Sequence, residues 1–166
     1  GTVVQEQVAN VEACYLRRLW EAETDACARL NALLEVSADQ SRQAERTVEE
    51  IQQEAGITYA PQQRRAVELA AQVGGLILPG GPGPGKTTAV RGTVALFRKM
   101  GLDIVLAAPT GRAAKRMSEL TGMEAQTVHR LLGMSWNDAT HQITFQKTEK
   151  VPLEADAVVV DVMSMV

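Results

Sequence analysis

The chain has 166 residues, of which 45% are hydrophobic and 22% charged, a globular composition that excludes a disordered chain and indicates one domain, alone or with an extra helical segment. Its uncharged apolar runs are far shorter than the roughly 20 residues of a membrane-spanning helix, so we expect no membrane association. Two cysteines are too few for a disulfide framework and predict a reducing, cytoplasmic location. Because the chain starts with Gly rather than Met, we expect a piece of a longer protein.

The net charge of −3 is unevenly distributed. Residues 1–55 carry 11 acidic and 5 basic side chains, a net charge of −6. Residues 56–166 carry 9 acidic and 12 basic side chains, a net charge of +3. This mildly basic second part is compatible with a polyanionic partner and equally with an ordinary solvated surface.

Residues 1–55 are predicted to form an N-terminal helical segment. Apolar side chains recur at steps of three and four across residues 3–36, which predicts a helix with one apolar face. A polar break at 37–41 precedes a second helix, roughly 42–55, that ends at Gly56. The segment offers no catalytic constellation, and we expect its apolar stripe to pack against the rest of a larger protein.

From Gly56 onward, helices and apolar strands alternate. Helices are predicted at 61–72, 86–100, 112–120 and 127–132. Strands are predicted at 76–78, 103–108 and 157–160, the last uniformly apolar and therefore buried on both faces. Residues 135–136 and 143–145 flank a turn and predict a small hairpin. The alternation predicts an α/β fold with a parallel sheet.

A phosphate-binding loop lies between the first predicted strand and the following helix. Residues 80–87 match G-x-x-x-x-G-K-[ST], whose glycines let several backbone N–H groups converge on one anion. The helix that follows adds the positive end of its dipole. Lys86 is expected to reach the β- and γ-phosphates of a nucleoside triphosphate, and the Thr87 hydroxyl to bind Mg²⁺. The predicted nucleotide-binding residues of the loop are Gly81, Gly83, Gly85, Lys86, Thr87 and Thr88.

Two prolines and one acidic residue also bear on phosphate and metal binding at the loop. Pro84 removes one potential phosphate donor, a loss of about 1.5–3 kcal/mol for a hydrogen bond to a charged group, and Pro79 cannot donate to a sheet neighbour. Asp161 follows the strand 157–160, at the carboxyl end where α/β proteins bind ligands, and is predicted to hold the metal. The alternative for Asp161 is a helix cap or a loop acid.

Four stretches together resemble the RecD-like DNA helicases of superfamily 1, the exodeoxyribonuclease V α-subunit family. Residues 60–67 (APQQRRAV) resemble the glutamine motif, and residues 80–88 the Walker A motif. Residues 107–116 (AAPTGRAAKR) resemble motif Ia and are followed by TVHRLL at 127–132, while residues 158–166 resemble motif II. The resemblance is specific over 56–166 and loose before it. It implies an incomplete RecA-like P-loop NTPase sheet over 56–166, preceded by the helical segment 1–55.

The resemblance also implies residue roles. Gln63 would recognise the adenine edge, because an amide donates and accepts at once, whereas the alternative is an exposed helix glutamine. Lys86 and Asp161 would be catalytic, and Thr87 and Asp161 would hold Mg²⁺. The residues implied to contact single-stranded DNA are Thr110, Gly111, Arg112, Thr127 and His129.

Four further side chains keep two interpretations each. Lys115 and Arg116 either extend a basic DNA-binding patch or form a solvated face. Trp136 and Phe145 either stack on bases or pack within the hairpin, and packing is favoured.

Two departures from the family pattern concern activity. Val162 stands where motif II has the glutamate that activates the attacking water, and the chain ends before a second motor domain. We therefore interpret the chain as a fragment of an ATP-dependent DNA helicase, deficient in hydrolysis by itself, with other helicase or nuclease subunits as partners. The alternatives are a non-catalytic nucleotide-binding module and another P-loop enzyme, such as a kinase.

Overall fold

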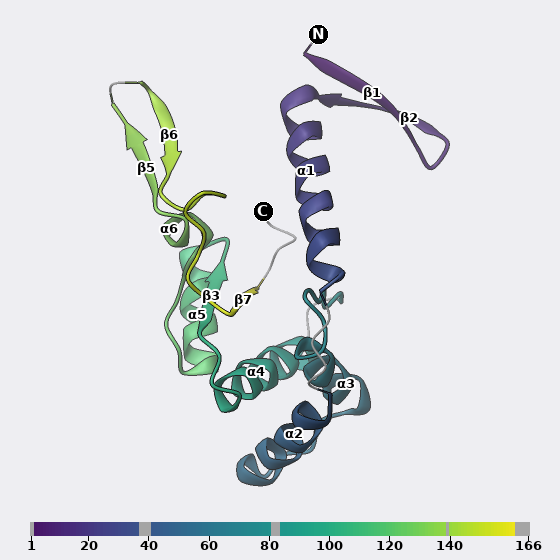
Figure 1. Ribbon diagram of the computed structural model, residues 1–166, viewed down its shortest axis with the longest axis vertical. Coiled ribbons are helices and arrows are strands. Elements are labelled where there is room, and N and C mark those ends of the chain that lie inside the picture. The colour runs from purple at the N-terminus through teal and green to yellow at the C-terminus, as the bar shows by residue number, and fades with distance from the viewer. Residues whose placement is uncertain (1, 37–40, 81–83, 139, 162–166) are drawn as a thin grey trace.

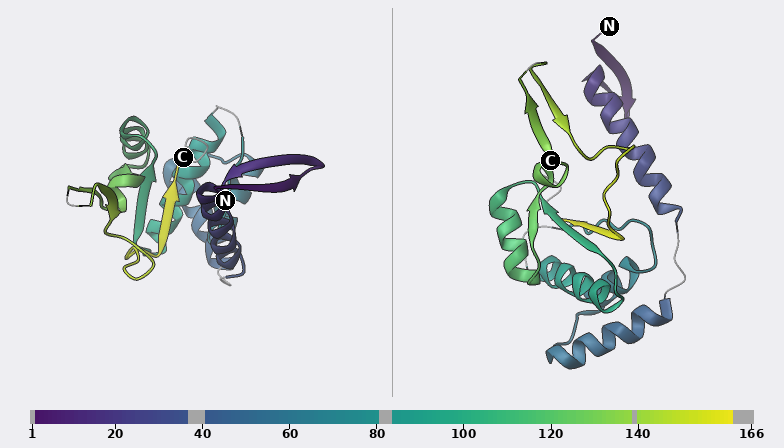
Figure 2. Two further views of the ribbon diagram at one scale, coloured as in Figure 1. Left: turned by 90° about the horizontal axis from the view of Figure 1, so that it is seen from above. Right: turned by 60° about the vertical axis from the view of Figure 1, so that its left-hand side comes forward.

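A computed structural model describes residues 2–36, 41–80, 84–138 and 140–161 (Figure 1). A base of three helices carries a parallel sheet, and two hairpins extend away from it on different sides (Figure 1). Seen from above, two strands of the sheet run side by side, while the N-terminal hairpin projects away from them (Figure 2). Within the described residues, no helix is both long and apolar enough to cross a membrane.

The chain begins with an antiparallel hairpin followed by a helix. Strands β1 (Val3–Val8) and β2 (Val11–Leu16) pair, and α1 (Arg17–Leu34) follows. The prediction of a helix is confirmed for 17–34 and wrong for 3–16. Ala9 and Asn10 both have positive φ, 48° and 66°, so they form the tight turn that reverses the chain.

The register of the hairpin explains why its apolar spacing predicted a helix. Val4 lies opposite Tyr15, and Val8 lies opposite Val11. Residues four apart occupy one face of a helix, but they also occupy one face of a strand because four is an even number. The same apolar spacing therefore suits both structures, and the turn decides between them.

Helix α1 lies on the surface of the structure. None of its residues is buried, and Leu19, Leu30, Leu33 and Leu34 are each more than half exposed. Its contacts with later residues include an exposed ion pair from Arg29 to Glu149. Just beyond the helix, the Gly74 N–H donates to the Val36 carbonyl at 2.8 Å. The expected packing of the apolar stripe against further protein stays a prediction.

The main core joins three helices. These are α2 (Ser41–Ala55), α3 (Pro61–Ala70) and α4 (Pro84–Lys99), all three of which were predicted. Gly56 ends α2 with a φ of 61°, as expected for a left-handed terminal glycine. The buried core residues are Ala44, Val48, Ile51, Tyr59, Val67, Ala71, Leu96 and Phe97. This core contains residues from both sides of the predicted domain division between residues 55 and 56. The division itself stays a prediction.

A parallel sheet in the order β4-β3-β7 confirms the predicted α/β class. Its elements, with the helices that follow, are β3 (Ile104–Ala108), α5 (Gly111–Thr121), β4 (Ala125–Thr127), α6 (Val128–Leu131) and β7 (Ala157–Val160). Val94 of α4, Leu106 of β3 and Met117 of α5 form a second buried cluster. The sheet therefore packs one face against α4 and α5.

Two strand predictions need correction. Residues 76–78 form no strand; Ile77 is 78% exposed, and within the described chain no segment pairs with this run. An apolar run becomes a strand only where a neighbour completes its hydrogen bonds. Strand β7 is not buried on both faces, since Val158 is 47% exposed on the side away from α4.

The second hairpin was predicted from its turn. Strands β5 (Met134–Asn137) and β6 (Gln142–Phe145) pair antiparallel, which confirms it. Trp136 and Phe145 lie in this hairpin and remain 58% and 43% exposed. The predicted helix at 127–132 is shorter, because residues up to Thr127 belong to β4.

The close contact between α3 and α4 generates a stability prediction. A Cβ atom on Gly92 would lie 2.8 Å from both Tyr59 Oη and Val67 Cγ2, in the buried core. Replacing Gly92 by Ala should therefore lower the free energy of unfolding by about 1–3 kcal/mol, measured by urea denaturation. Gly111→Ala is the control, since nothing lies within 4 Å of a Cβ there. Equal stability of the two variants would refute the packing argument.

Candidate functional site

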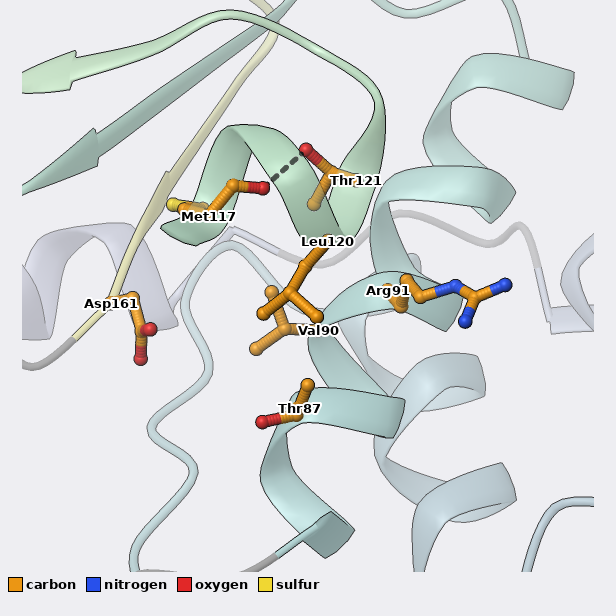
Figure 3. A pocket seen from close by; sticks show the side chains of 7 residues that line it. All are labelled: Thr87, Val90, Arg91, Met117, Leu120, Thr121 and Asp161. Carbon is orange, nitrogen blue, oxygen red and sulfur yellow. Dashed lines mark hydrogen bonds between the residues drawn. The ribbon is translucent and has the colours of Figure 1, made fainter. Parts of the chain in front are cut away.

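A small pocket lies where the end of β7 meets α4 and α5 (Figure 3). Its lining residues are Thr87, Val90 and Arg91 from α4, Met117, Leu120 and Thr121 from α5, and Asp161 after β7. Two of the predicted site residues, Thr87 and Asp161, are therefore brought together across 74 positions of sequence. Sequence reasoning missed Arg91, whose position one helical turn after Thr87 was the available signal.

The sheet positions Asp161. Its backbone N–H donates to the Ala107 carbonyl at 3.1 Å, which continues the pairing of β7 with β3 one residue beyond the strand. The Thr87 hydroxyl, in the first turns of α4, points toward the side of the pocket where the Asp161 carboxylate lies (Figure 3). The Arg91 guanidinium points away from it (Figure 3).

A hydroxyl and a carboxylate are oxygen donors of the kind that Mg²⁺ prefers, and Mg²⁺ in phosphate sites typically uses one or two protein ligands plus phosphate oxygens. Within the described ranges, no group of three or more His, Cys, Asp or Glu side chains could hold a metal. Thr87 and Asp161 therefore fit a nucleotide-bound Mg²⁺, whereas the described residues form no all-protein metal cage.

The described part of the phosphate loop shows how its lysine is held. The Lys86 ammonium donates to the Gly80 carbonyl, which joins the two ends of the loop. Gly80 has a φ of 145°, a conformation that glycine adopts readily. Gly81 and Gly83 lie outside the described residues. Helix α4 begins at Pro84, where a missing N–H costs no intrahelical bond, so the predicted effect of Pro84 concerns phosphate alone.

Gln63 has two backbone partners. Its Oε1 accepts from the Ala60 N–H at 3.0 Å, which satisfies the first N–H before α3. Its Nε2 donates to the Gly85 carbonyl at 3.3 Å, in the first turn of α4. The predicted contact with adenine stays a prediction, but the alternative of a merely exposed helix glutamine does not describe this side chain.

The predicted DNA-binding residues lie at the same edge of the sheet. Thr110 follows β3, and Thr127 ends β4 directly opposite Ala108. Both threonines cap helices: Thr110 accepts from the Ala113 N–H and Thr127 from the Arg130 N–H, each at 3.2 Å. Their DNA role stays a prediction, and capping is a role that the sequence reasoning missed.

The remaining predicted DNA-binding residues follow these caps. Gly111 is the first residue of α5, and Arg112 and His129 are exposed. Lys115 and Arg116 are exposed on α5 as well. Exposed cations beside a helix N-terminus suit phosphate binding and equally suit a solvated surface.

Ionisation near the site involves Tyr59. Burial raises the pKa of the Tyr59 hydroxyl, and the Arg91 guanidinium partly offsets this by favouring the phenolate. The phenol is therefore neutral at physiological pH. The positive charge of Arg91 acts on Tyr59, the residue shortly before α3.

Comparison with known proteins agrees with this geometry. The protein family described as "AAA domain" matches residues 63–166, more than half of the chain. The chain therefore belongs to this family. Within it, the chain is RecD-like, as the motifs predicted.

Two of the three relatives described here are named as DNA helicases, and the third as a subunit of the RecBCD enzyme. The "ATP-dependent RecD2 DNA helicase" of Deinococcus radiodurans is 41% identical over 90 residues, covering 54% of this chain and 12% of that protein. The "RecBCD enzyme subunit RecD" of Mycolicibacterium smegmatis is 33% identical over 175 aligned positions, covering 92% and 30%. The "ATP-dependent DNA helicase dda" of phage T4 is 38% identical over 71 residues, covering 42% and 16%. The chain thus spans less than a third of the length of these relatives.

The cap at the start of α5 can be tested separately from DNA binding. Thr110→Ala removes the acceptor for the Ala113 N–H and should lower the free energy of unfolding by about 1 kcal/mol. Thr110→Ser keeps a hydroxyl and should retain most of the stability. Denaturant titration of both variants measures this, and an alanine variant as stable as the serine variant would contradict the capping role.

Proposed function

We propose that this chain supplies the ATP-binding part of a RecD-like DNA helicase, which couples ATP hydrolysis to DNA unwinding in the whole protein. The observation that carries the proposal is the pocket that joins Thr87, at the start of α4, to Asp161, at the end of β7. The family match over 63–166 and the names of the relatives support it.

In this proposal, the phosphate loop binds the triphosphate of ATP. Backbone amides at the start of α4, with the helix dipole, attract the phosphates, and Lys86 stabilises charge on the β- and γ-phosphates. The bond to the Gly80 carbonyl uses one of the three N–H donors of the Lys86 ammonium, so the other donors can bind phosphate oxygens in charge-assisted contacts. Thr87 and Asp161 would hold Mg²⁺, which neutralises phosphate charge when bound.

Single-stranded DNA would lie along the neighbouring strand ends. Thr110, Gly111 and Arg112 at the start of α5 would bind its phosphodiester backbone. Thr127 and His129, after β4, would extend this contact. Because β4, β3 and β7 are parallel neighbours, the proposed DNA-binding and metal-binding residues lie at the carboxyl ends of adjacent strands.

The hydrolytic activity of this chain alone depends on a residue outside the described ranges. Val162, next to Asp161, cannot take a proton from water as the family glutamate would, so we expect ATP binding with slow turnover. This observation favours a second candidate function, a non-catalytic nucleotide-binding module. A kinase is disfavoured, because two of these relatives are named as DNA helicases and the third as a subunit of the RecBCD enzyme.

The proposal also covers partner subunits, cellular location and domain division. Relatives named as subunits of the RecBCD enzyme support other helicase or nuclease subunits as partners. A cytoplasmic location and a division into residues 1–55 and 56–166 belong to the same proposal.

Equilibrium binding of a fluorescent ATP analogue with Mg²⁺ tests the proposed function. Lys86→Ala should weaken binding roughly 10–100-fold, since it removes a charged hydrogen bond to phosphate. Lys150→Ala, an exposed lysine beyond the second hairpin, is the matched control and should leave affinity unchanged. Turnover is measured in parallel. Equal affinity of the Lys86→Ala and parent proteins, or no binding by the parent, would refute the proposal.

A further inference from the structure

We propose that Gln63 is a positioning residue for the phosphate loop, in addition to any contact it makes with adenine. Its side chain ties the start of α3 to the first turn of α4, immediately before Lys86. This inference rests on the proposed function, because it concerns how the same loop holds phosphate.

The tie is defined by two hydrogen bonds. Gln63 Oε1 accepts from the Ala60 N–H at 3.0 Å, and Gln63 Nε2 donates to the Gly85 carbonyl at 3.3 Å. The side chain is half-buried, and its two partners lie on different helices, one at the start of α3 and one at the start of α4. The Gly85 carbonyl belongs to the turn whose amides would face the phosphates. A shift of Gly85 would therefore displace those amides and the Lys86 backbone.

Close packing joins α3 to α4 beside these two hydrogen bonds. Tyr59, just before α3, and Val67, within it, both pack against Gly92 of α4 so closely that a Cβ there would be 2.8 Å from each. Val67 is completely buried. Because α3 packs against the middle of α4, Gln63 can tie the first turn of α4 to a helix that is already in contact with it.

Gln63 retains hydrogen-bonding capacity for a ligand. A primary amide has two N–H donors and an oxygen with two acceptor sites. The bonds that Gln63 makes to described residues use one donor and one acceptor site, so toward that part of the chain one of each remains. This is the complement that the adenine edge requires. A bound base would then connect through one side chain to the carbonyl before Lys86.

A base-free polyphosphate separates positioning from base recognition. Inorganic tripolyphosphate with Mg²⁺ has no adenine, so a residue that only recognised the base would not affect its binding. Gln63→Met keeps the side-chain length but removes both donor and acceptor. Gln62→Met, at the neighbouring exposed position of α3, is the matched control. Affinities for tripolyphosphate and for ATP are measured for both variants and the parent, well below their melting temperatures.

The proposal predicts that Gln63→Met weakens tripolyphosphate binding roughly 3–10-fold, and ATP binding by at least as much, while Gln62→Met changes neither. Unchanged tripolyphosphate affinity with weakened ATP binding would overturn positioning and leave base recognition and the proposed function intact. A variant that loses both ligands only in proportion to its unfolded fraction, determined from its melting curve, would also overturn it. No binding of either ligand by the parent would instead refute the proposed function.

Discussion

The parallel pairing of β3 with both β4 and β7 is the constraint on which the candidate site depends. Parallel strands end at the same edge of a sheet, so residues that follow β3, β4 and β7 must lie near one another whatever their separation in sequence. Asp161 extends this pairing through its bond to Ala107, and α4 presents Thr87 to the same pocket. Nucleotide chemistry and DNA contact are thereby proposed for adjacent positions of one edge.

Several groups at this edge already have protein partners in the structure. Lys86 is bonded to Gly80, Gln63 to Ala60 and Gly85, and Thr110 to Ala113. Such bonds satisfy polar groups that would otherwise be left unpaired, and they hold side chains near the geometry that a ligand needs. The bonds of Gln63 and Lys86 to described residues leave both side chains capacity for a further partner, since the Lys86 ammonium has three donors and Gly80 accepts from one.

Much of this arrangement was predictable from sequence, because strong local signals specify it. Glycine and proline residues at helix boundaries allowed α2 to α5 to be predicted. The Gly-Lys-Thr spacing predicted Thr87, and the apolar strand before Asp161 predicted the second oxygen donor of the pocket. The N-terminal hairpin was not predictable, since Val4, Val8, Val11 and Tyr15 satisfy both helical and strand periodicity. The strand expected at 76–78 failed because pairing depends on a neighbour, which local sequence does not reveal. The caps formed by Thr110 and Thr127 follow a known signal that the resemblance to DNA-binding motifs obscured.

The most direct test of the central claim is the Mg²⁺ dependence of nucleotide affinity, measured by calorimetric titration of the parent protein and Asp161→Asn with ATP, with and without Mg²⁺. If Thr87 and Asp161 form one metal site, Mg²⁺ strengthens binding to the parent, and most of that enhancement disappears in Asp161→Asn. An enhancement of the same size in both proteins would contradict the claim that the end of β7 and the start of α4 act on one nucleotide-bound metal.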